Sequence, residues 1–430
     1  MITKRPEPNE IFTPRNPEVN RDMYVSRPDL ERKLRRAVNG TQHIIVFGDS
    51  GSGKTWLYKE HFGANSISFR TVDLSIALTE GVSSALLKAL PKKEWRPVRR
   101  KVSGDAGVDI YVARVGASGT VEYEHTEVLP LDALLSDLSS QSDGSRFIVF
   151  DNFEQISTRP DLLKEIASLI IRLDNTDFAS YGVRFLFVGV VADMKELIAH
   201  YDQAGTVANR VTEIPEVERL SVSEAEKLVR RGLFDKLRID AVIDESRLVR
   251  RVLFMTDRNA QQLHELCYQI ACDAEEHGWK LAEDGLERAE RDWVDTSLSH
   301  YCAQIESRMN KRETKIQRRN QVLFCLGSSD KESIRANDID AMIREHFPST
   351  AAAAQLGIDQ ILAWLADGRN PILIRNPNEN SYRLSHPKLK LAIRVGLQQL
   401  APDDPRDSEE ENSFLDSLLA ALEQAPKMDG

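Results

Sequence analysis

The chain has 430 residues, enough for two to four domains that each bury a hydrophobic core. Apolar residues make up 41% and charged residues 29%, and no apolar run approaches the roughly 20 residues that span a bilayer. The net charge of −10 excludes a general nucleic-acid binder, because nucleic acids bind to basic surfaces. The amino-terminal residues lack the apolar stretch of a secretory signal, and the four cysteines form no C-x-x-C pair. We therefore expect a cytoplasmic protein without disulfides or structural zinc.

The first predicted elements are a lead-in, a helix and a strand. Residues 1–20 are rich in proline, asparagine and charge, and we expect an extended segment there. A helix is expected after Pro28, because the fixed φ of proline suits the first turn of a helix. The apolar residues 43–47 predict a buried strand, and residues 56–62 predict the first turns of a second helix.

Between this strand and the second helix, residues 48–55 read GDSGSGKT and fit the P-loop pattern G-x-x-x-x-G-K-[ST] at every position. The glycines let successive backbone N–H groups point at phosphates, and the positive end of the helix dipole adds to their field. Lys54 would reach the β- and γ-phosphates of ATP, and the Thr55 hydroxyl would ligate Mg²⁺. The predicted nucleotide-binding residues of this motif are Asp49, Ser50, Gly51, Ser52, Gly53, Lys54, Thr55 and Trp56.

Residues 92–128 interrupt the alternation of strands and helices. Residues 108–115 and 120–125 alternate at strand period around a glycine-containing turn, which predicts an inserted β-hairpin. The stem of this hairpin, residues 92–101, holds six basic residues around Trp95. Two interpretations stay open: a contact for DNA or a neighbouring subunit, or a solvated insertion.

A second motif follows at residues 147–150, where four apolar residues precede Asp151 in the Walker B pattern. A buried strand of this kind delivers its acid to the carboxyl edge of a parallel sheet, where ligands bind. Asp151 would hold Mg²⁺, and Glu154 would orient and activate the attacking water. The alternative is that Asp151 is an ordinary residue of a strand-end turn. Further predicted strands, separated by helices, favour a doubly wound parallel α/β sheet; they lie at residues 69–74, 183–190 and 211–214.

From Ser221 onward the sequence is nearly all helical, which predicts a helical lid. A third region is predicted to contain three helices followed by a hairpin, the order of a winged helix. Its helices are expected at 317–326, 337–346 and 351–365, and its hairpin strands at 372–375 and 381–384. Residues 399–430 are expected to form an acidic linker and a small amphipathic helix, which either docks or frays.

The positive charge of the chain is concentrated near this third region. Residues 311–400 contain 14 Lys/Arg against 9 Asp/Glu, a charge of +5, whereas residues 401–430 contain 2 against 9, a charge of −7. The predicted helix 351–365 has no lysine or arginine, so direct base readout by this helix is not expected. The candidates for a local DNA contact are the stem 92–101 together with Arg375, Arg383, Lys388, Lys390 and Arg394.

Taken in order, these features resemble an AAA+ ATPase of the lineage that contains the origin-recognition-type initiators, whose bacterial relatives shade into the STAND signalling ATPases. The resemblance covers about residues 20–398 and rests on the P-loop, the Walker B strand, the segment Y-V-S-R-P-D-L at 24–30, the lid entry at 213–224 and the winged helix. It implies an AAA+ core at 21–215, a helical lid at 216–308 and a winged-helix domain at 309–398.

The resemblance also implies roles for residues outside the two motifs. It places the adenine near Val25 and Arg27. Arg210 matches an arginine finger, which would reach the γ-phosphate in a neighbouring subunit; the alternative is a surface arginine. Arg258 falls near the sensor-2 arginine of the lid, with the register off by about one residue.

Two departures from the family pattern favour a slow switch over a fast motor. Asn152 stands where many members have the catalytic glutamate, so the base would be Glu154. Residues 189–191 read G-V-V, where a polar sensor residue is common. The resemblance therefore predicts an ATP- and Mg²⁺-dependent switch that controls assembly with itself or with an effector protein, and it implies a role in bacterial defence against phage or mobile elements. The alternative is a DNA-binding initiator or loader.

Overall fold

The chain divides into two compact units, and each is described by itself. We call residues Pro17–Glu218 the sheet unit, and Met1–Asn16 together with Arg219–Gly430 the helical unit. The computed structural model describes residues 5–91, 130–141, 144–173, 175–190, 194–200, 207–310, 317–331, 333–351, 355–376 and 380–398. The predicted hairpin 92–128 with its basic stem, and the predicted tail 399–430, lie outside these residues.

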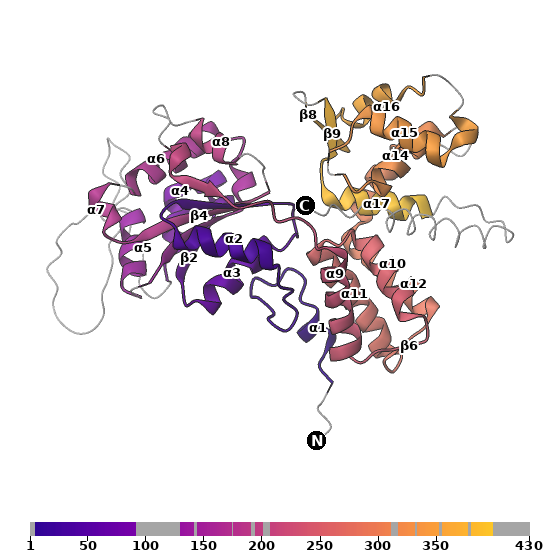
Figure 1. Cartoon of the computed structure of the whole chain (residues 1–430), viewed down its shortest axis with the longest axis horizontal. Helices are drawn as coiled ribbons and strands as arrows, with labels where there is room; N and C mark the ends of the chain where they lie inside the picture. The colour runs from indigo at the N-terminus through magenta and orange to yellow at the C-terminus, as the bar shows by residue number, and fades with distance from the viewer. Residues whose placement is uncertain are drawn as a thin grey trace. The chain divides into compact units, whose positions relative to one another are not determined.

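The sheet unit contains five parallel strands in the order β2-β3-β4-β1-β5 (Figure 1). The strands are β1 (His43–Phe47), β2 (Ser68–Asp73), β3 (Arg146–Asp151), β4 (Val183–Gly189) and β5 (Val211–Glu213). Parallel strands need crossover connections, and here helices supply them, as expected for a doubly wound sheet. The predicted α/β class is confirmed.

Alternate strand residues pack against helices on opposite faces of the sheet, which gives three layers. On one face, Phe147 and Val149 pack with residues of α2 (Pro28–Asn39) and α3 (Lys54–Ala64). On the other face, Ile148 and Phe150 pack with residues of the remaining helices of the unit. This period of two is what a pleated strand buried on both faces produces.

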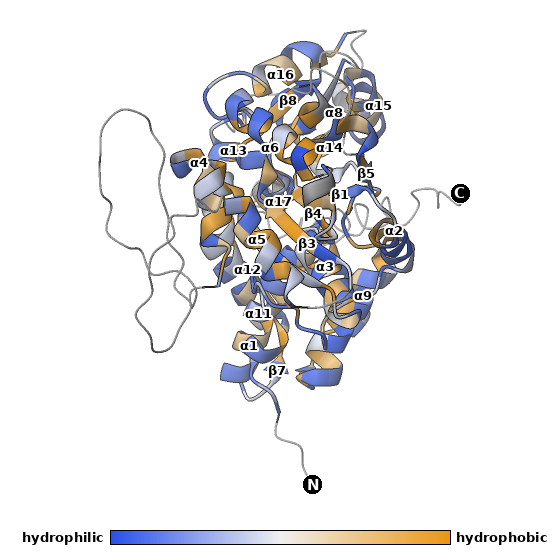
Figure 2. Cartoon of the chain, turned by 90° about the vertical axis from the view of Figure 1, so that its left-hand side faces the viewer, coloured by the Kyte–Doolittle hydropathy of each residue, from blue (hydrophilic) through white to orange (hydrophobic). Residues whose placement is uncertain are grey.

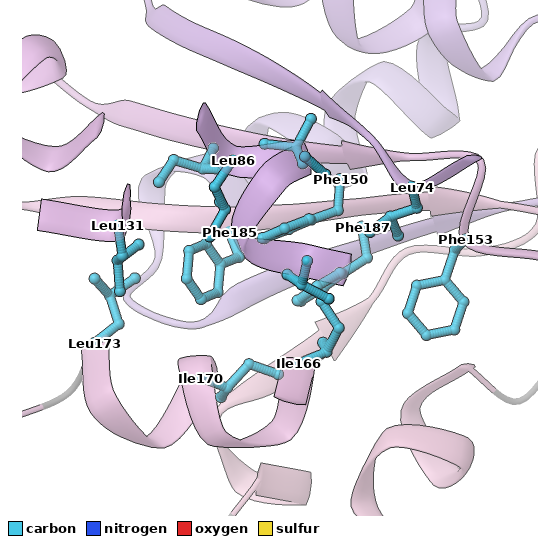
Figure 3. Close-up of a cluster of buried hydrophobic side chains, with 14 of the residues drawn as sticks. Leu74, Leu86, Leu131, Phe150, Phe153, Ile166, Ile170, Leu173, Phe185 and Phe187 are labelled. Carbon is cyan, nitrogen blue, oxygen red and sulfur yellow. The ribbon is translucent and has the colours of Figure 1, made fainter. Parts of the chain in front are cut away.

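The second face carries the larger hydrophobic cluster, built around stacked aromatic rings (Figure 3). Phe150 and Phe187, from neighbouring strands, stack with their ring centroids 5.3 Å apart. The helices over this face are α4 (Leu74–Lys88), α5 (Pro130–Ser139), α6 (Pro160–Leu173), α7 (Thr176–Ala179) and α8 (Met194–Ala199). The helix α4 begins at Leu74, where Asp73 caps its first turn by accepting from the Ser75 N–H, and it is interrupted at Gly81 (φ +81°).

The second chain segment of the helical unit, which starts at Arg219, begins with a helical bundle. Its elements are α9 (Val222–Arg230), the π-helical turn η3 (Arg231–Lys236), β6 (Asp240–Ala241), α10 (Glu245–Thr256), α11 (Ala260–Glu276), β7 (Lys280–Leu281), α12 (Glu283–Ser297) and α13 (Ser299–Glu306). Ser221 caps α9 with the predicted capping box, since its hydroxyl accepts from the Glu224 N–H and the Glu224 carboxylate accepts from the Ser221 N–H. Figure 2 shows hydrophobic and hydrophilic residues interleaved along these helices.

The last part of this unit contains α14 (Arg318–Ser328), α15 (Ala336–His346), η4 (Pro348–Thr350), α16 (Ile358–Leu365), β8 (Leu373–Asn376), β9 (Ser381–Leu384) and α17 (Pro387–Gln398). The strands β8 and β9 pair as the predicted antiparallel hairpin, and Ile334 bridges to Tyr382 beside it. The helix predicted at 351–365 is shorter than expected. It begins only at Ile358, because Gly357 adopts the left-handed conformation (φ +70°). The winged-helix interpretation stays a prediction.

The amino-terminal lead-in differs from the extended segment that we expected. Residues Pro8–Ile11 form the short helix α1, which packs against α11 of the helical unit. Ile11 and Phe12 are buried, and the Phe12 ring meets the His264 ring edge-on, with centroids 5.9 Å apart. The Thr13 N–H donates to Nδ1 of His264 over 3.2 Å. The proline-rich composition of residues 1–20 predicted an extended segment because it gave no weight to these two apolar residues.

We expect His264 to make the helical unit less stable in mild acid. Burial lowers the pKa of His264 to about 4, whereas in the unfolded chain the pKa is about 6.5. The unfolded state therefore binds more protons between these pKa values, and the free energy of unfolding falls as pH drops through that window, by about 1.4 kcal/mol per pH unit. Urea unfolding at pH 7.5, 6 and 5 measures this loss. His264→Gln, which does not titrate, should show less acid sensitivity than the wild type; equal slopes would contradict the assignment.

Among the residues that the structure describes, no helix is both long and apolar enough to cross a membrane.

Candidate functional site

The P-loop residues form a tight turn between β1 and α3. Gly48, Gly51 and Gly53 have φ values of +146°, +79° and +99°, a region that side chains rarely allow. A Cβ atom on Gly48 would lie 2.4 Å from the carbonyl oxygen of Val217, so the loop passes directly against that backbone. Glycine is therefore required at position 48 for two reasons: the Val217 backbone lies too close for a Cβ atom, and the φ value disfavours other residues.

Lys54 lies in the first turn of α3 and folds over the loop. Its ammonium group donates to the carbonyl oxygens of Gly48 and Asp49 over 2.8 and 2.7 Å. Burial lowers the pKa of Lys54, and the charges of Glu154, Asp49 and Asp151 oppose that shift. The two acids of the Walker B segment are thus close enough to act on the P-loop lysine. Thr55 and Trp56 follow Lys54 in the same turn and are partly buried.

Asp151 ends β3 at the carboxyl edge of the sheet, as the Walker B pattern predicts. Burial raises the pKa of Asp151, while the Asn152 N–H, which donates to its Oδ1 over 2.9 Å, lowers it. Glu154 follows in the 3₁₀ turn η1 (Phe153–Gln155), and its Oε2 accepts from the backbone N–H of Val190 over 3.2 Å. The amide at the end of β4 therefore orients Glu154, where a polar sensor side chain was missing from the sequence.

A hydrogen-bonded pair, Asp73 and Asn152, holds this turn in place, although neither residue had a predicted role in the site. Asn152 is left-handed (φ +61°), and its amide nitrogen donates to Oδ1 of Asp73 over 2.9 Å. Asp73 ends β2 at the same register as Asp151 ends β3. The signal available in the sequence was this repetition: an acid, Asp73 or Asp151, lies at or next to the end of each of these two strands, and parallel strands bring such residues together.

Arg27 links the chain before α2 to the P-loop. Its guanidinium donates to the carbonyl oxygens of Ser52, over 2.7 Å, and of Glu218, over 2.9 Å. Val25 is buried nearby in the sequence, at 8% exposure. The hydroxyl of Ser52 is buried and has no hydrogen-bond partner among the described residues. Arg27, one of the two predicted adenine-side residues, is therefore hydrogen-bonded to the phosphate loop.

Arg210 lies at the amino end of β5, where its carbonyl oxygen accepts from the His43 N–H. Because β5 runs parallel to β1, this end is the sheet edge opposite to the P-loop. Arg210 is therefore not placed to reach the phosphates bound by its own loop.

Arg258 and the DNA-contact candidates at 375–394 belong to the helical unit. The Arg258 guanidinium lies 3.5 Å from the carboxylate of Asp330. Arg375 and Arg383 are exposed on the hairpin strands. Lys388 and Lys390 are buried instead: Lys388 pairs with Glu265 at 3.5 Å, and Lys390 pairs with Asp257 at 2.9 Å.

The buried ion pairs correct one part of the DNA interpretation. An ammonium group already held by a carboxylate inside the fold cannot also neutralise a phosphate, so Lys388 and Lys390 are wrong as DNA contacts. Arg394 is likewise buried, and its guanidinium donates to the Gly327 carbonyl and to Asp257. Sequence spacing could not reveal this, because the partners are 123 to 133 residues away for the two lysines (388 − 265 and 390 − 257).

Comparison with known proteins agrees with this geometry. Residues 36–198 match the family model described as AAA domain. The chain carries an AAA domain. This domain has the α/β P-loop fold that the sequence resemblance implied, with the P-loop and the Walker B segment both inside the matched region. No curated protein matches the chain by sequence.

Several solved structures are similar to the chain over most of their length. A Walker-type ATPase of Pyrococcus abyssi matches at 12% identity and a TM-score of 0.48, covering 87% of this chain and 97% of that one. The ORC2 protein of Aeropyrum pernix in its ADP form matches at 14% identity and a TM-score of 0.45, covering 97% and 99%. Cdc6p from Pyrobaculum aerophilum matches at 14% identity and a TM-score of 0.42, covering 91% and 98%.

The close packing around Gly189, at the end of β4, leads to a test of the Glu154 position. A Cβ atom on Gly189 would lie 2.9 Å from Cβ of Phe153 and 3.3 Å from Oε2 of Glu154. Gly189→Ala should therefore displace η1 and lower ATP turnover about 10- to 100-fold while ATP affinity is kept, because small misplacements of a catalytic group are costly. Steady-state hydrolysis and ATP titration measure the two effects. Gly144→Ala, where a Cβ meets nothing within 4 Å, is the control; equal loss in both variants would contradict the argument.

Proposed function

We propose that the AAA domain binds ATP with Mg²⁺, hydrolyses it slowly, and uses the nucleotide to control assembly with another copy or a partner protein in the cytoplasm. The observation that carries this proposal is the convergence of Lys54, Asp151 and Glu154 at the carboxyl edge of the sheet. A lysine from the start of α3 and two acids from the end of β3 and the turn after it are the groups that phosphoryl transfer needs.

The residues of the loop fit a polyphosphate. The buried Ser52 hydroxyl has an unused donor among the described residues, and a phosphate oxygen would accept from it. Lys54 would exchange the Gly48 and Asp49 carbonyls for phosphate oxygens, which are stronger acceptors because they are charged. Bound Mg²⁺ would neutralise developing phosphate charge; Thr55 and Asp151 would hold it.

The chain's own residues then have separate tasks. Glu154, aimed by the Val190 N–H, would accept the proton of the attacking water. Val25 and Arg27 would border the adenosine. A shift of Arg27 on nucleotide binding would reach the P-loop through its hydrogen bond to the Ser52 carbonyl. Arg258 is the proposed sensor-2 residue of the lid, and its guanidinium lies 3.5 Å from the Asp330 carboxylate.

A neighbouring copy is needed to complete this site. Arg210 lies at the opposite edge of its own sheet, so an arginine finger at this position acts on the next subunit. Such a finger contributes about 10³- to 10⁵-fold to turnover. We therefore infer that ATP hydrolysis depends on assembly.

The experiment is steady-state ATP hydrolysis with Mg²⁺ over a range of protein concentrations. Turnover per chain should rise with concentration in the wild type. Arg210→Ala and Lys54→Ala should each be inactive, and mixing the two variants should restore part of the activity, because one supplies an intact P-loop and the other an intact finger. A protein that fails to bind ATP, or a mixture that stays inactive although each variant assembles, would overturn the shared-site proposal.

A DNA-binding initiator or loader is the second candidate, and one observation favours it: Arg375 and Arg383 are exposed on the hairpin β8–β9. Against it, the nearby cations Lys388, Lys390 and Arg394 are buried in the fold, and α16 has no basic residue. Tight, sequence-specific binding of duplex DNA by the purified protein alone would favour this candidate over the switch.

A further inference from the structure

The amino-terminal segment contacts both units, one after the other along the chain. Residues 8–15 bind to the helical unit and residues 17–25 belong to the sheet unit. The chain therefore passes between the units twice, at 16/17 and at 218/219. The second passage is expected from the order of the domains, whereas the first creates an additional connection that the sequence analysis did not foresee.

The first half of the segment is fixed to α11 by contacts of different kinds. Phe12 is 1% exposed and packs against His264, whose Nδ1 accepts from the Thr13 N–H. The next residue of α11, Glu265, pairs with Arg15 at 3.3 Å. An apolar anchor, a partly buried hydrogen bond and an ion pair on adjacent α11 residues fix both the position and the direction of this half.

The second half is fixed to α3, the helix that begins with the P-loop lysine. The Lys59 ammonium donates to the Pro17 carbonyl over 2.6 Å and lies 3.8 Å from the Glu18 carboxylate. Arg21 pairs with Glu60 at 3.3 Å. Lys59 and Glu60 are five and six residues after Lys54 in the same helix, so a movement of α3 moves their partners.

The connection between the half bound to α11 and the half bound to α3 is a short turn. Only Asn16 separates Arg15 from Pro17, and two extended residue steps span at most about 7 Å. Arg15 is left-handed (φ +60°), and the Asn16 N–H donates to the Thr13 carbonyl over 3.3 Å. A turn of this kind has little slack to absorb a displacement of either anchor.

We propose that residues 8–25 act as a strap that transmits movements of the P-loop helix α3 to helix α11 of the helical unit. The proposal rests on the ATP-dependent switch proposed above and supplies a route by which nucleotide at the P-loop alters the helical unit. The alternative is that the segment only packs, in which case its length would not matter.

The test lengthens the strap while keeping every anchor. About ten Gly/Ser residues inserted between Asn16 and Pro17 give a flexible connection of roughly 15–20 Å. The full-length protein is compared by hydrogen exchange of α11 with and without ATP–Mg²⁺. In the wild type, ATP should slow exchange in α11 about tenfold; in the insertion variant the change should fall below about twofold while ATP affinity is kept.

Two further variants control for the insertion itself. The same insertion between Gly368 and Arg369, an exposed loop of the helical unit, should leave the ATP effect on α11 intact. Lys59→Met removes the hydrogen bond to the Pro17 carbonyl without inserting residues. Like the strap insertion, it should reduce the effect of ATP on hydrogen exchange in α11.

The outcomes separate this proposal from the proposed function. If the wild type binds no ATP, the switch itself fails. If it binds ATP but α11 exchange does not respond, or responds equally in the strap-insertion variant, the ATP-binding function stands and the strap is overturned.

Discussion

ATP turnover is expected to fall about 10²- to 10⁴-fold when Glu154 is replaced by glutamine, while ATP binding is retained. Glutamine keeps the size of the side chain and can still meet the Val190 N–H through its carbonyl oxygen. It cannot accept a proton from water at neutral pH. The loss should therefore appear in the chemical step, as a lower rate in single-turnover measurements at saturating ATP.

The neighbouring Lys54 gives the contrast that identifies the role of Glu154. Lys54→Ala should lower both turnover and ATP affinity, because its ammonium group would contact phosphates in the ground state as well as in the transition state. Glu196→Gln, on the exposed surface of α8, is the matched control and should leave both quantities unchanged. Retention of full turnover in Glu154→Gln would assign the base to another residue, and Asp151 would be the first to examine.

Local patterns were sufficient to predict the sheet unit. An unbroken P-loop motif, four apolar residues ahead of Asp151, and alternating elements together specify parallel strands with their carboxyl ends at one edge. The orientation of Glu154 was not predictable from these patterns. Its hydrogen-bond donor is the backbone N–H of Val190. Every residue except proline has such a group, so the residue type at position 190 does not indicate this contact.

The helical unit shows the opposite case. Helix positions followed from periodicity, but the roles of charged residues did not, since a lysine in a solvated face and a lysine in a buried pair look alike in sequence. Lys390 was interpreted as a DNA contact and is in fact held by Asp257, 133 residues away (390 − 257). The prediction of an extended lead-in was wrong because composition does not show which residues are buried. Two apolar residues, Ile11 and Phe12, are buried in a segment whose composition otherwise suggests solvent exposure.

The ion cluster around Asp257 connects α10 to α17 within the helical unit. The Asp257 carboxylate accepts from Lys390 at 2.9 Å, from Arg394 at 3.1 Å and from Arg219 at 2.8 Å. Burial alone would raise the pKa of Asp257, but these three cations outweigh it and hold the pKa well below its ordinary value. Asp257 therefore pairs with three cations that come from different segments of the chain.

Asp257→Asn is expected to destabilise the helical unit by about 3–5 kcal/mol, because Lys390 and Arg394 would stay buried without their counter-ion. Urea unfolding at pH 7 measures this. Asp340→Asn, which breaks the partly exposed pair with Arg344, is the control and should cost less than about 0.5 kcal/mol. The double variant Asp257→Asn/Lys390→Met should recover part of the loss, since it removes a cation that the single change leaves unpaired.

The pH dependence of this cluster has a definite sign. An aspartate whose pKa is depressed in the folded state contributes stability above its unfolded pKa, about 3.9, and that contribution is lost as pH falls through the lower folded value. The difference in unfolding free energy between wild type and Asp257→Asn should therefore persist from pH 7 to about pH 5 and shrink only in stronger acid. The His264 effect is lost between about pH 6.5 and 4, so the two groups can be separated by pH in one titration. A difference that already vanishes at pH 6 would show that Asp257 does not carry the charge that the cluster requires.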